Sequence, residues 1–251
     1  MPASAPSLPV RILRRAAVLV LALVASLLPS LSQPASAQPM FASATTAFTT
    51  NPDPVHGQRF DIVGQVFLLV GDPATPFPNQ TVTLERRTST SAPWSPVGQA
   101  TTVETTLSNG EKHYMFTFHR VADRTASFRV RYAGSGEAIG GSLSDDGTAK
   151  PVLVRVHRKM PIRLLQPKPS RIDLAGSVTP LFARHRVTVL RKTCAACAWR
   201  SFATPLTDSR GRYRVRLSVP RKGSHYFRAR TPATNGFSQS YSPQARIRAA
   251  S

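Results

Sequence analysis

The stretch VTLERR at Val82–Arg87 is followed seven residues later by Trp94, and it returns as VTVLRK at Val187–Lys192, followed at the same distance by Trp199. The correspondence extends in both directions, pairing Phe60–Gly64 with Ile172–Gly176 and Phe128–Arg131 with Phe227–Arg230. A repeat of roughly a hundred residues indicates two copies of one domain in tandem. We therefore expect a first repeat at residues 49–156 and a second at residues 157–251.

The N-terminal residues have the pattern of a secretory signal peptide. Three arginines precede an apolar run at Ala16–Leu28, and Ala35-Ser36-Ala37 matches a small-x-small cleavage site. The run of about 13 residues is shorter than the ~20 that span a bilayer as a helix. We expect a signal peptide at 1–37 and a mature chain without a membrane span, the alternative being an uncleaved membrane anchor. The Ala-, Ser- and Thr-rich residues 38–48 are expected to form a flexible leader.

Short runs of alternating apolar and polar residues, separated by turn residues, predict an all-β protein. In the second repeat, strands are expected near 171–178, 185–192, 200–203, 212–219, 224–231 and 245–248, with an edge strand near 161–165. Pro161–Pro169 is expected to include the connection between the repeats. Trp94 and Trp199 are interpreted as core or sheet-face aromatics, with ligand stacking as the alternative.

The repeats resemble the bacterial immunoglobulin-like (Ig-like) or fibronectin-type β-sandwich modules found in exported proteins of high-GC Gram-positive bacteria. The shared features are a G-x-V opening (Gly64–Val66, Gly176–Val178), the V-T-L/V strand with its tryptophan, a D-x-x-G-x-Y turn (Asp208, Gly211, Tyr213) and the F-R-V/A-R strand. This resemblance implies two tandem Ig-like sandwiches that serve as scaffolds for adhesion, spacing or binding. In the first repeat Gly110 precedes Tyr114 by two residues more than Gly211 precedes Tyr213.

The two cysteines, Cys194 and Cys197, form a single C-x-x-C between two strand-like runs. A redox pair would want a helix N-terminus, and a zinc site would need further ligands that the surrounding sequence lacks. The first and fourth residues of a β-turn lie close enough for a disulfide. In an oxidising compartment we expect a disulfide that closes this hairpin.

The net charge of +21 is distributed unevenly. Residues 38–155 contain ten Lys and Arg against ten Asp and Glu, whereas residues 156–251 contain 20 against two, Asp173 and Asp208. The second repeat therefore carries +18, and a genome-wide arginine bias does not explain why only one repeat is basic. Charge of this density favours a polyanionic ligand, although a solvated basic surface without a ligand is the alternative.

Strand alternation predicts where these charges lie. In Arg212–Leu217 the apolar residues share one face and the three arginines the other. The neighbouring strands of the opposite sheet are expected to gather a polyanion-binding face, whose candidate residues are Arg186, Lys192, Tyr226, Arg228, Arg230, Arg246 and Arg248. The Arg212, Arg214 and Arg216 stripe is expected on the other sheet.

The sequence argues against catalysis and cofactors. The six histidines are scattered without metal-ligand spacing, no G-x-S-x-G is present, and the second repeat has two acids. We expect no catalytic, cofactor or metal residues. Few aromatics and no known motif argue against nucleic acid as the partner.

The leading hypothesis is a secreted, non-enzymatic tandem of Ig-like domains. Its basic second repeat would associate electrostatically with anionic cell-envelope polymers, so that the protein is released or held at the cell surface without a covalent link. The alternative is a structural or adhesion module that binds another protein through sheet edges or loops.

Overall fold

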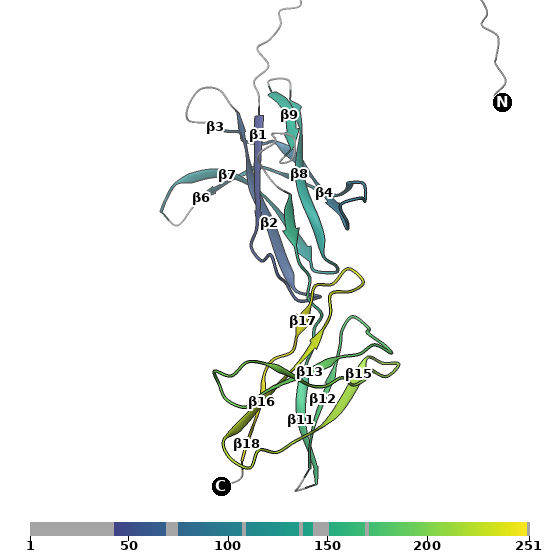
Figure 1. The fold of residues 1–251 in the computed structure, drawn as a ribbon. Coiled ribbons are helices and arrows are strands. Elements are labelled where there is room, and N and C mark those ends of the chain that lie inside the picture. The colour runs from purple at the N-terminus through teal and green to yellow at the C-terminus, as the bar shows by residue number, and fades with distance from the viewer. Residues whose placement is uncertain are drawn as a thin grey trace, which may run out of the picture. The chain divides into compact units, whose positions relative to one another are not determined.

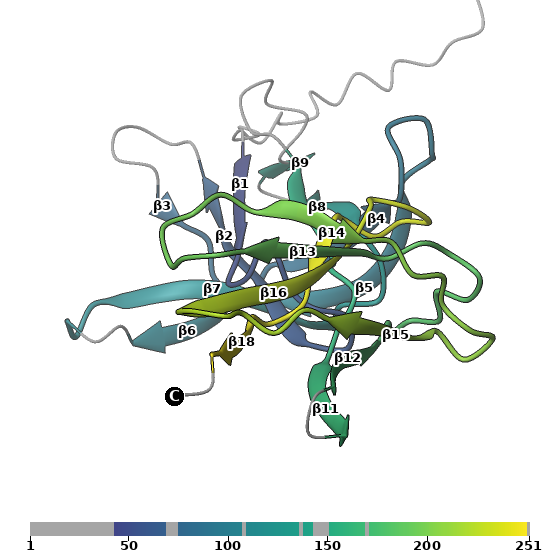
Figure 2. The ribbon, with the colours of Figure 1, turned by 60° about the horizontal axis from the view of Figure 1, so that its bottom comes forward.

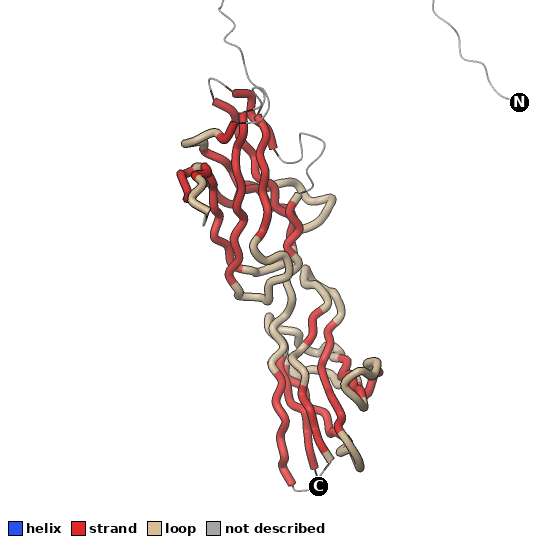
Figure 3. The backbone as a smooth tube through the Cα atoms, turned by 90° about the vertical axis from the view of Figure 1, so that its left-hand side faces the viewer, coloured by secondary structure: helices blue, strands red, loops and turns tan. Residues whose placement is uncertain are grey.

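Residues along β2 (Arg59–Leu68) alternate between the interior and the surface: Phe60, Ile62, Gly64 and Val66 are buried, and the residues between them are only partly covered. The structure, a computed structural model, describes residues 43–68, 75–106, 109–135, 138–142, 151–168 and 171–249. All regular secondary structure in these residues is β-strand (Figure 3). The expectation of an all-β protein is confirmed. The predicted signal peptide lies outside the described residues.

Two sheets form from the first repeat (Figure 1). One has the order β1 (Ser43–Thr49), β2, β7 (Lys112–Val121), β6 (Val103–Thr106), and β3 (Thr75–Pro76) also pairs with β2. The other has the order β10 (Val152–Val154), β8 (Ala126–Ser135), β4 (Thr81–Arg87), β5 (Ser95–Thr101), and β9 (Ala138–Ser142) also pairs with β8.

Two further sheets form from the second repeat, and Figure 2 shows β13 and β16 side by side in the larger one. The smaller has the order β11 (Ile162–Lys168), β12 (Arg171–Ser177), β15 (Arg212–Leu217). The larger has the order β14 (Arg200–Ala203), β13 (Thr188–Lys192), β16 (Ser224–Thr231), β17 (Ser240–Tyr241), and β18 (Ala245–Arg248) also pairs with β16.

Each repeat has its own cluster of buried apolar side chains. In the first repeat, Ile62 and Phe116 of one sheet belong to the same cluster as Leu84 and Val130 of the other. In the second, a corresponding cluster includes Leu174 and Tyr213 from the smaller sheet and Val189, Phe227 and Ile247 from the larger. The outer faces of the two sheets therefore point in opposite directions within each repeat.

The predicted flexible leader is wrong over its described part, because β1 begins at Ser43 and pairs with β2 from Ser43↔Leu68 to Thr49↔Ile62. Backbone hydrogen bonds hold an edge strand in place whatever its side chains are. A run of Ala, Ser and Thr can therefore form a strand without showing apolar alternation.

The connection between the repeats lies before the proline-rich segment, which forms β11 instead. The Arg155 and His157 N–H groups donate to the carbonyls of Pro52 and Pro54. From the loop before β17 of the second repeat, the Ser238 N–H donates to the Val156 carbonyl. The connection is thus hydrogen-bonded to both repeats and does not form a free linker.

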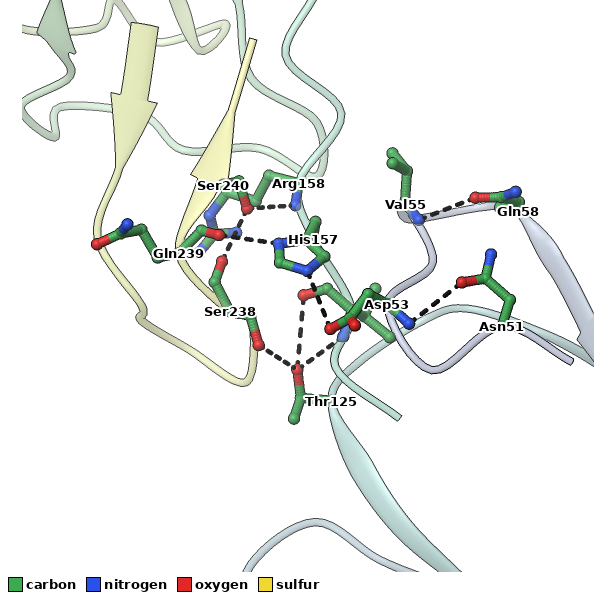
Figure 4. A network of polar contacts seen from close by, with 11 residues as sticks. Asn51, Asp53, Val55, Gln58, Thr125, His157, Arg158, Ser238, Gln239 and Ser240 are labelled. Carbon is green, nitrogen blue, oxygen red and sulfur yellow. Dashed lines mark hydrogen bonds and ion pairs between the residues drawn. The ribbon is translucent and has the colours of Figure 1, made fainter. Parts of the chain in front are cut away.

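Side chains strengthen this junction (Figure 4). His157 places Nδ1 2.8 Å from the Gln239 carbonyl oxygen and Nε2 3.5 Å from a carboxylate oxygen of Asp53. Arg158 is buried between the rings of Phe182 and Phe237, 4.7 and 4.4 Å from their centroids. Burial lowers the pKa of this guanidinium, since the charged form loses its hydration.

The structure also corrects the alignment of the repeats at their turns. Gly64 faces Phe116 in the first repeat, and Gly176 faces Tyr213 in the second. Phe116 is therefore the counterpart of Tyr213 by register, although Tyr114 is the tyrosine that follows the turn glycine in the sequence. The hairpin of β6 and β7 lengthens the first repeat at this point, so spacing from the turn glycine misplaces the equivalent ring.

Candidate functional site: a cation–aromatic face

The larger sheet of the second repeat gathers basic and aromatic side chains on its outer face. Across three strands, Lys192 pairs with Tyr226 and Tyr226 with Arg246. Because residues two apart along a strand share a face, Arg228 and Arg230 lie on the same side as Tyr226, and Arg248 on the same side as Arg246. The residues between them, such as Phe227 and Ile247, are buried.

Cations and rings alternate across this face. Lys192 Nζ lies 5.1 Å from the centroid of Trp199 and 5.2 Å from that of Tyr226, and the Arg246 guanidinium lies 5.4 Å from Tyr226. The guanidinium of Arg228 lies between Trp199 and Tyr241, 4.4 and 4.3 Å from their centroids. We call the following set the cation–aromatic face: Lys192, Trp199, Tyr226, Arg228, Tyr241 and Arg246.

The guanidinium of Arg228 is held by its rings, since the side chain forms no hydrogen bond or ion pair with any residue that the structure describes. Its Nε is buried without a partner. A guanidinium stacked on an aromatic ring gains about 0.5–2 kcal/mol while the N–H groups in its plane stay free to donate at the edge. The rings thus orient the donors of Arg228 without using them.

Four of the predicted site residues meet in this face: Lys192, Tyr226, Arg228 and Arg246. Arg230 and Arg248 share the sheet face by register, next to Tyr241 and Ser224. Arg186 has an isolated bridge to Leu206 and lies outside the register that joins the members of the face. Its exposed side chain lies before β13 begins.

Sequence reasoning missed Trp199 and Tyr241 as members. Trp199 is half-buried on the sheet face, in agreement with the sheet-face interpretation, and its contacts are with cations. The repeated tryptophan was a usable signal, because in each repeat it follows the same strand. Tyr241 lies in β17, which has two residues and is therefore too short to show any periodicity.

The first repeat has the tryptophan and its two cations, but Ser127 and Leu153 stand where the second repeat has Tyr226 and Arg246. Trp94 contacts Arg87 and Arg129, whose guanidinium carbons lie 4.5 and 4.7 Å from its ring centroid. Here, however, Arg129 Nε donates to Glu85 at 2.5 Å. The second repeat has Leu190 at the position of Glu85, and Leu190 pairs with Arg228 as Glu85 pairs with Arg129.

The predicted disulfide is confirmed. Cys194 and Cys197 are bonded, with their Cα atoms 5.1 Å apart, in the loop between β13 and β14. Lys192 Nζ donates to the Ala195 carbonyl within this loop at 2.5 Å. The disulfide therefore shapes the segment that joins Lys192 to Trp199, and through it one end of the cation–aromatic face.

Both acids of the second repeat lie away from this face. Asp173, on β12, accepts hydrogen bonds from Arg171 and Arg214, which lower the pKa of its carboxyl. It is inaccessible because these side chains cover it on the outer surface of the smaller sheet. Asp208 accepts the backbone N–H groups of Arg210 and Arg212, which also lower its pKa.

The smaller sheet carries the expected arginine stripe. Arg212, Arg214 and Arg216 are exposed, while Tyr213 and Leu217 between them are buried. Burial raises the pKa of the Tyr213 hydroxyl. The described part of the chain contains no cluster of three or more His, Cys, Asp and Glu side chains that could hold a metal ion.

Comparisons with known proteins give little further information. No family model matches the chain, and no curated protein matches it. The chain is similar to a solved structure described as a tetra-tandem repeat in the extending region of a large adhesion protein, with 14% identity and a TM-score of 0.29. The match covers 84% of this chain and 49% of the other, so the chain spans about half the length of that structure.

Among the described residues, no helix is long and apolar enough to cross a membrane.

Proposed function

We propose that each repeat is an Ig-like β-sandwich. Support comes from the strand order: β1-β2-β7-β6 against β10-β8-β4-β5 corresponds to A-B-E-D against G-F-C-C′ of that fold. The second repeat has the same order in β11-β12-β15 and in β14-β13-β16-β18, without a fourth strand in its smaller sheet. Separate buried clusters support one domain for each repeat.

We infer that the chain is an exported, non-enzymatic protein whose second repeat binds anionic polymers of the cell envelope. The observation that carries this function is the absence of any carboxylate from the cation–aromatic face as described. Neighbouring cations without counter-charges repel one another, and a polyanion relieves that repulsion. The first repeat uses Glu85 for the same purpose.

The chemistry of the face suits phosphate and carboxylate oxygens. A guanidinium presents a planar set of donors that matches either oxyanion, and stacked arginines keep these donors oriented. Single-stranded nucleic acid is less favoured, because bases need free ring faces on which to stack. Here cations already lie over Trp199, Tyr226 and Tyr241.

The experiment measures retention of the full chain on purified cell envelopes as salt concentration rises. Retention of wild type on the envelopes should fall steeply as the salt concentration rises, since each polyanion contact displaces condensed counter-ions. The variant R228E/R230E/R246E/R248E should lose retention. A control with the same change in charge is K159E/R210E/R221E/K222E, whose positions are exposed and lie off the face.

Equal loss in both variants would assign retention to net charge, and unchanged retention in the first would place the site elsewhere. Retention insensitive to salt would overturn the electrostatic function. That result would support the alternative of an adhesion module with a protein partner, because apolar interfaces are not weakened by salt.

A further inference from the structure

A groove of about 870 Å³ crosses the smaller sheet of the second repeat, on the opposite side of the sandwich from the cation–aromatic face. Its floor is formed by the consecutive residues Ala175, Gly176 and Ser177 of β12. Arg163 of β11 is paired with Ala175, and Arg212 of β15 with Ser177. Two arginines therefore stand on opposite sides of a floor made of small residues.

The charged side chains that line the groove are three arginines and one carboxylate, so its net charge is positive. Arg214 is bound to Asp173, whereas Asp208 is hydrogen-bonded by backbone N–H groups and keeps its negative charge. The guanidinium groups of Arg163 and Arg212 form no hydrogen bond or ion pair with the residues that the structure describes, and both side chains are exposed. Their donors are available to a bound oxyanion.

This groove is particular to the second repeat. By register, the counterparts of Arg163 and Ala175 in the first repeat are Phe48 and Val63. Gln65 stands in place of Ser177, and Met115 precedes Phe116 as Arg212 precedes Tyr213. The first repeat thus has larger side chains on the floor and apolar ones at the sides.

We propose that this groove binds a second segment of anionic polymer, so that the second repeat bridges two polymer chains. This proposal rests on the proposed function, in which the cation–aromatic face binds the first segment. The buried cluster lies between the two sheets, so their outer faces point apart and one extended segment does not lie along both. Two sites on opposite faces would cross-link long chains without any further contact.

The test mixes the full chain with long-chain polyphosphate and measures binding by co-sedimentation with polymer-coated beads and bridging by light scattering. Wild type should bind, and its scattering should rise, pass through a maximum and fall again in excess polymer, when each molecule holds one chain. Short tripolyphosphate should compete with both signals.

Two groove variants separate charge from shape. R163Q/R212Q removes the two free cations, and A175V/S177Q fills the floor with residues of the first repeat while leaving the charge unchanged. Each should keep bead binding within about twofold and lose most of the scattering. R221Q/K222Q, at exposed positions off both faces, matches the charge change of the first variant and should scatter like wild type.

The outcomes distinguish the two proposals. If wild type does not bind the polymer-coated beads, the proposed function of polymer binding is rejected. Binding without scattering would reject bridging and leave the first site intact. If A175V/S177Q is folded by circular dichroism and still scatters like wild type, the groove is not the second site. If R221Q/K222Q loses as much scattering as R163Q/R212Q, bridging depends on net charge, and the groove is again rejected as the second site.

Discussion

The guanidinium of Arg228 lies 4.4 Å from the ring centroid of Trp199, and no carboxylate of the described residues reaches it. In the first repeat the equivalent arginine has the same ring contact but is neutralised by Glu85. The two repeats differ electrostatically on this face at the position of Glu85, where the second repeat has Leu190, and at the position of Arg246, where the first repeat has Leu153 by register. Binding by Arg228 is expected to follow the first of these differences.

Leu190→Glu should remove the contact between Arg228 and the polymer. A carboxylate at this position can pair with Arg228 as Glu85 pairs with Arg129. One charge-assisted hydrogen bond contributes about 1.5–3 kcal/mol, so affinity for polyphosphate should fall roughly tenfold or more. The slope of log affinity against log salt should fall by about 0.7–0.9, the value for one lost contact.

The reciprocal change, Glu85→Leu, is the matched control. It should free Arg129 from its carboxylate and increase the salt-dependent affinity of the whole chain. An L190E variant that retains the full wild-type salt slope while folded would contradict the role of Arg228.

Removing the disulfide should lower the affinity for polyphosphate clearly while lowering the stability of the fold only slightly. C194S/C197S frees the loop that holds Lys192 beside Trp199. A disulfide that closes so short a loop contributes at most about 2 kcal/mol in the chain-entropy model. We expect a small shift in melting temperature and a several-fold lower affinity for polyphosphate. Unchanged affinity in C194S/C197S would show that the disulfide does not position the face.

Gly64 and Gly176, which lie opposite Phe116 and Tyr213 on the neighbouring strands, should not tolerate substitution by alanine. A Cβ on Gly176 would come within 2.4 Å of the Tyr213 hydroxyl, and one on Gly64 within 1.8 Å of the Thr46 backbone oxygen. Overpacking of this kind typically costs about 1–3 kcal/mol. G64A should be the more severe in urea unfolding, since a backbone oxygen in a strand cannot move aside as a side chain can. Equal effects would indicate that β1 shifts freely.

Asp173 should contribute to stability at neutral pH and less in acid. Arg171 and Arg214 lower the pKa of its carboxyl in the folded chain below the unfolded value of about 3.9. The contribution is therefore complete above that pH and is lost as pH falls through the folded pKa. Urea midpoints of Asp173→Asn should lie below those of wild type at neutral pH and approach them near pH 2. A constant difference would exclude this ion pair as the cause.

Much of the fold could be predicted from local pattern. The alternation in Arg212–Leu217 correctly placed three arginines outside, and the spacing of Cys194 and Cys197 correctly indicated a disulfide. β1 escaped prediction because an edge strand is held by backbone pairing, which no side-chain pattern reports. The counterpart of Tyr213, Phe116, could not be found from the spacing because an inserted hairpin changes spacing along the chain without changing register in the sheet.

The sequence alone determined the all-β class, the duplication and the unequal charge, because these are visible in periodicity, self-similarity and composition respectively. Only the tertiary structure decided which charges are free. Glu85 neutralises Arg129 across two paired strands, and Leu190 leaves Arg228 unneutralised at the same place. Tyr241 comes beside Arg228 from a two-residue strand, and Arg163 and Arg212 flank β12 on opposite sides, at Ala175 and Ser177. These relationships depend on register between strands distant in sequence, which local pattern does not encode.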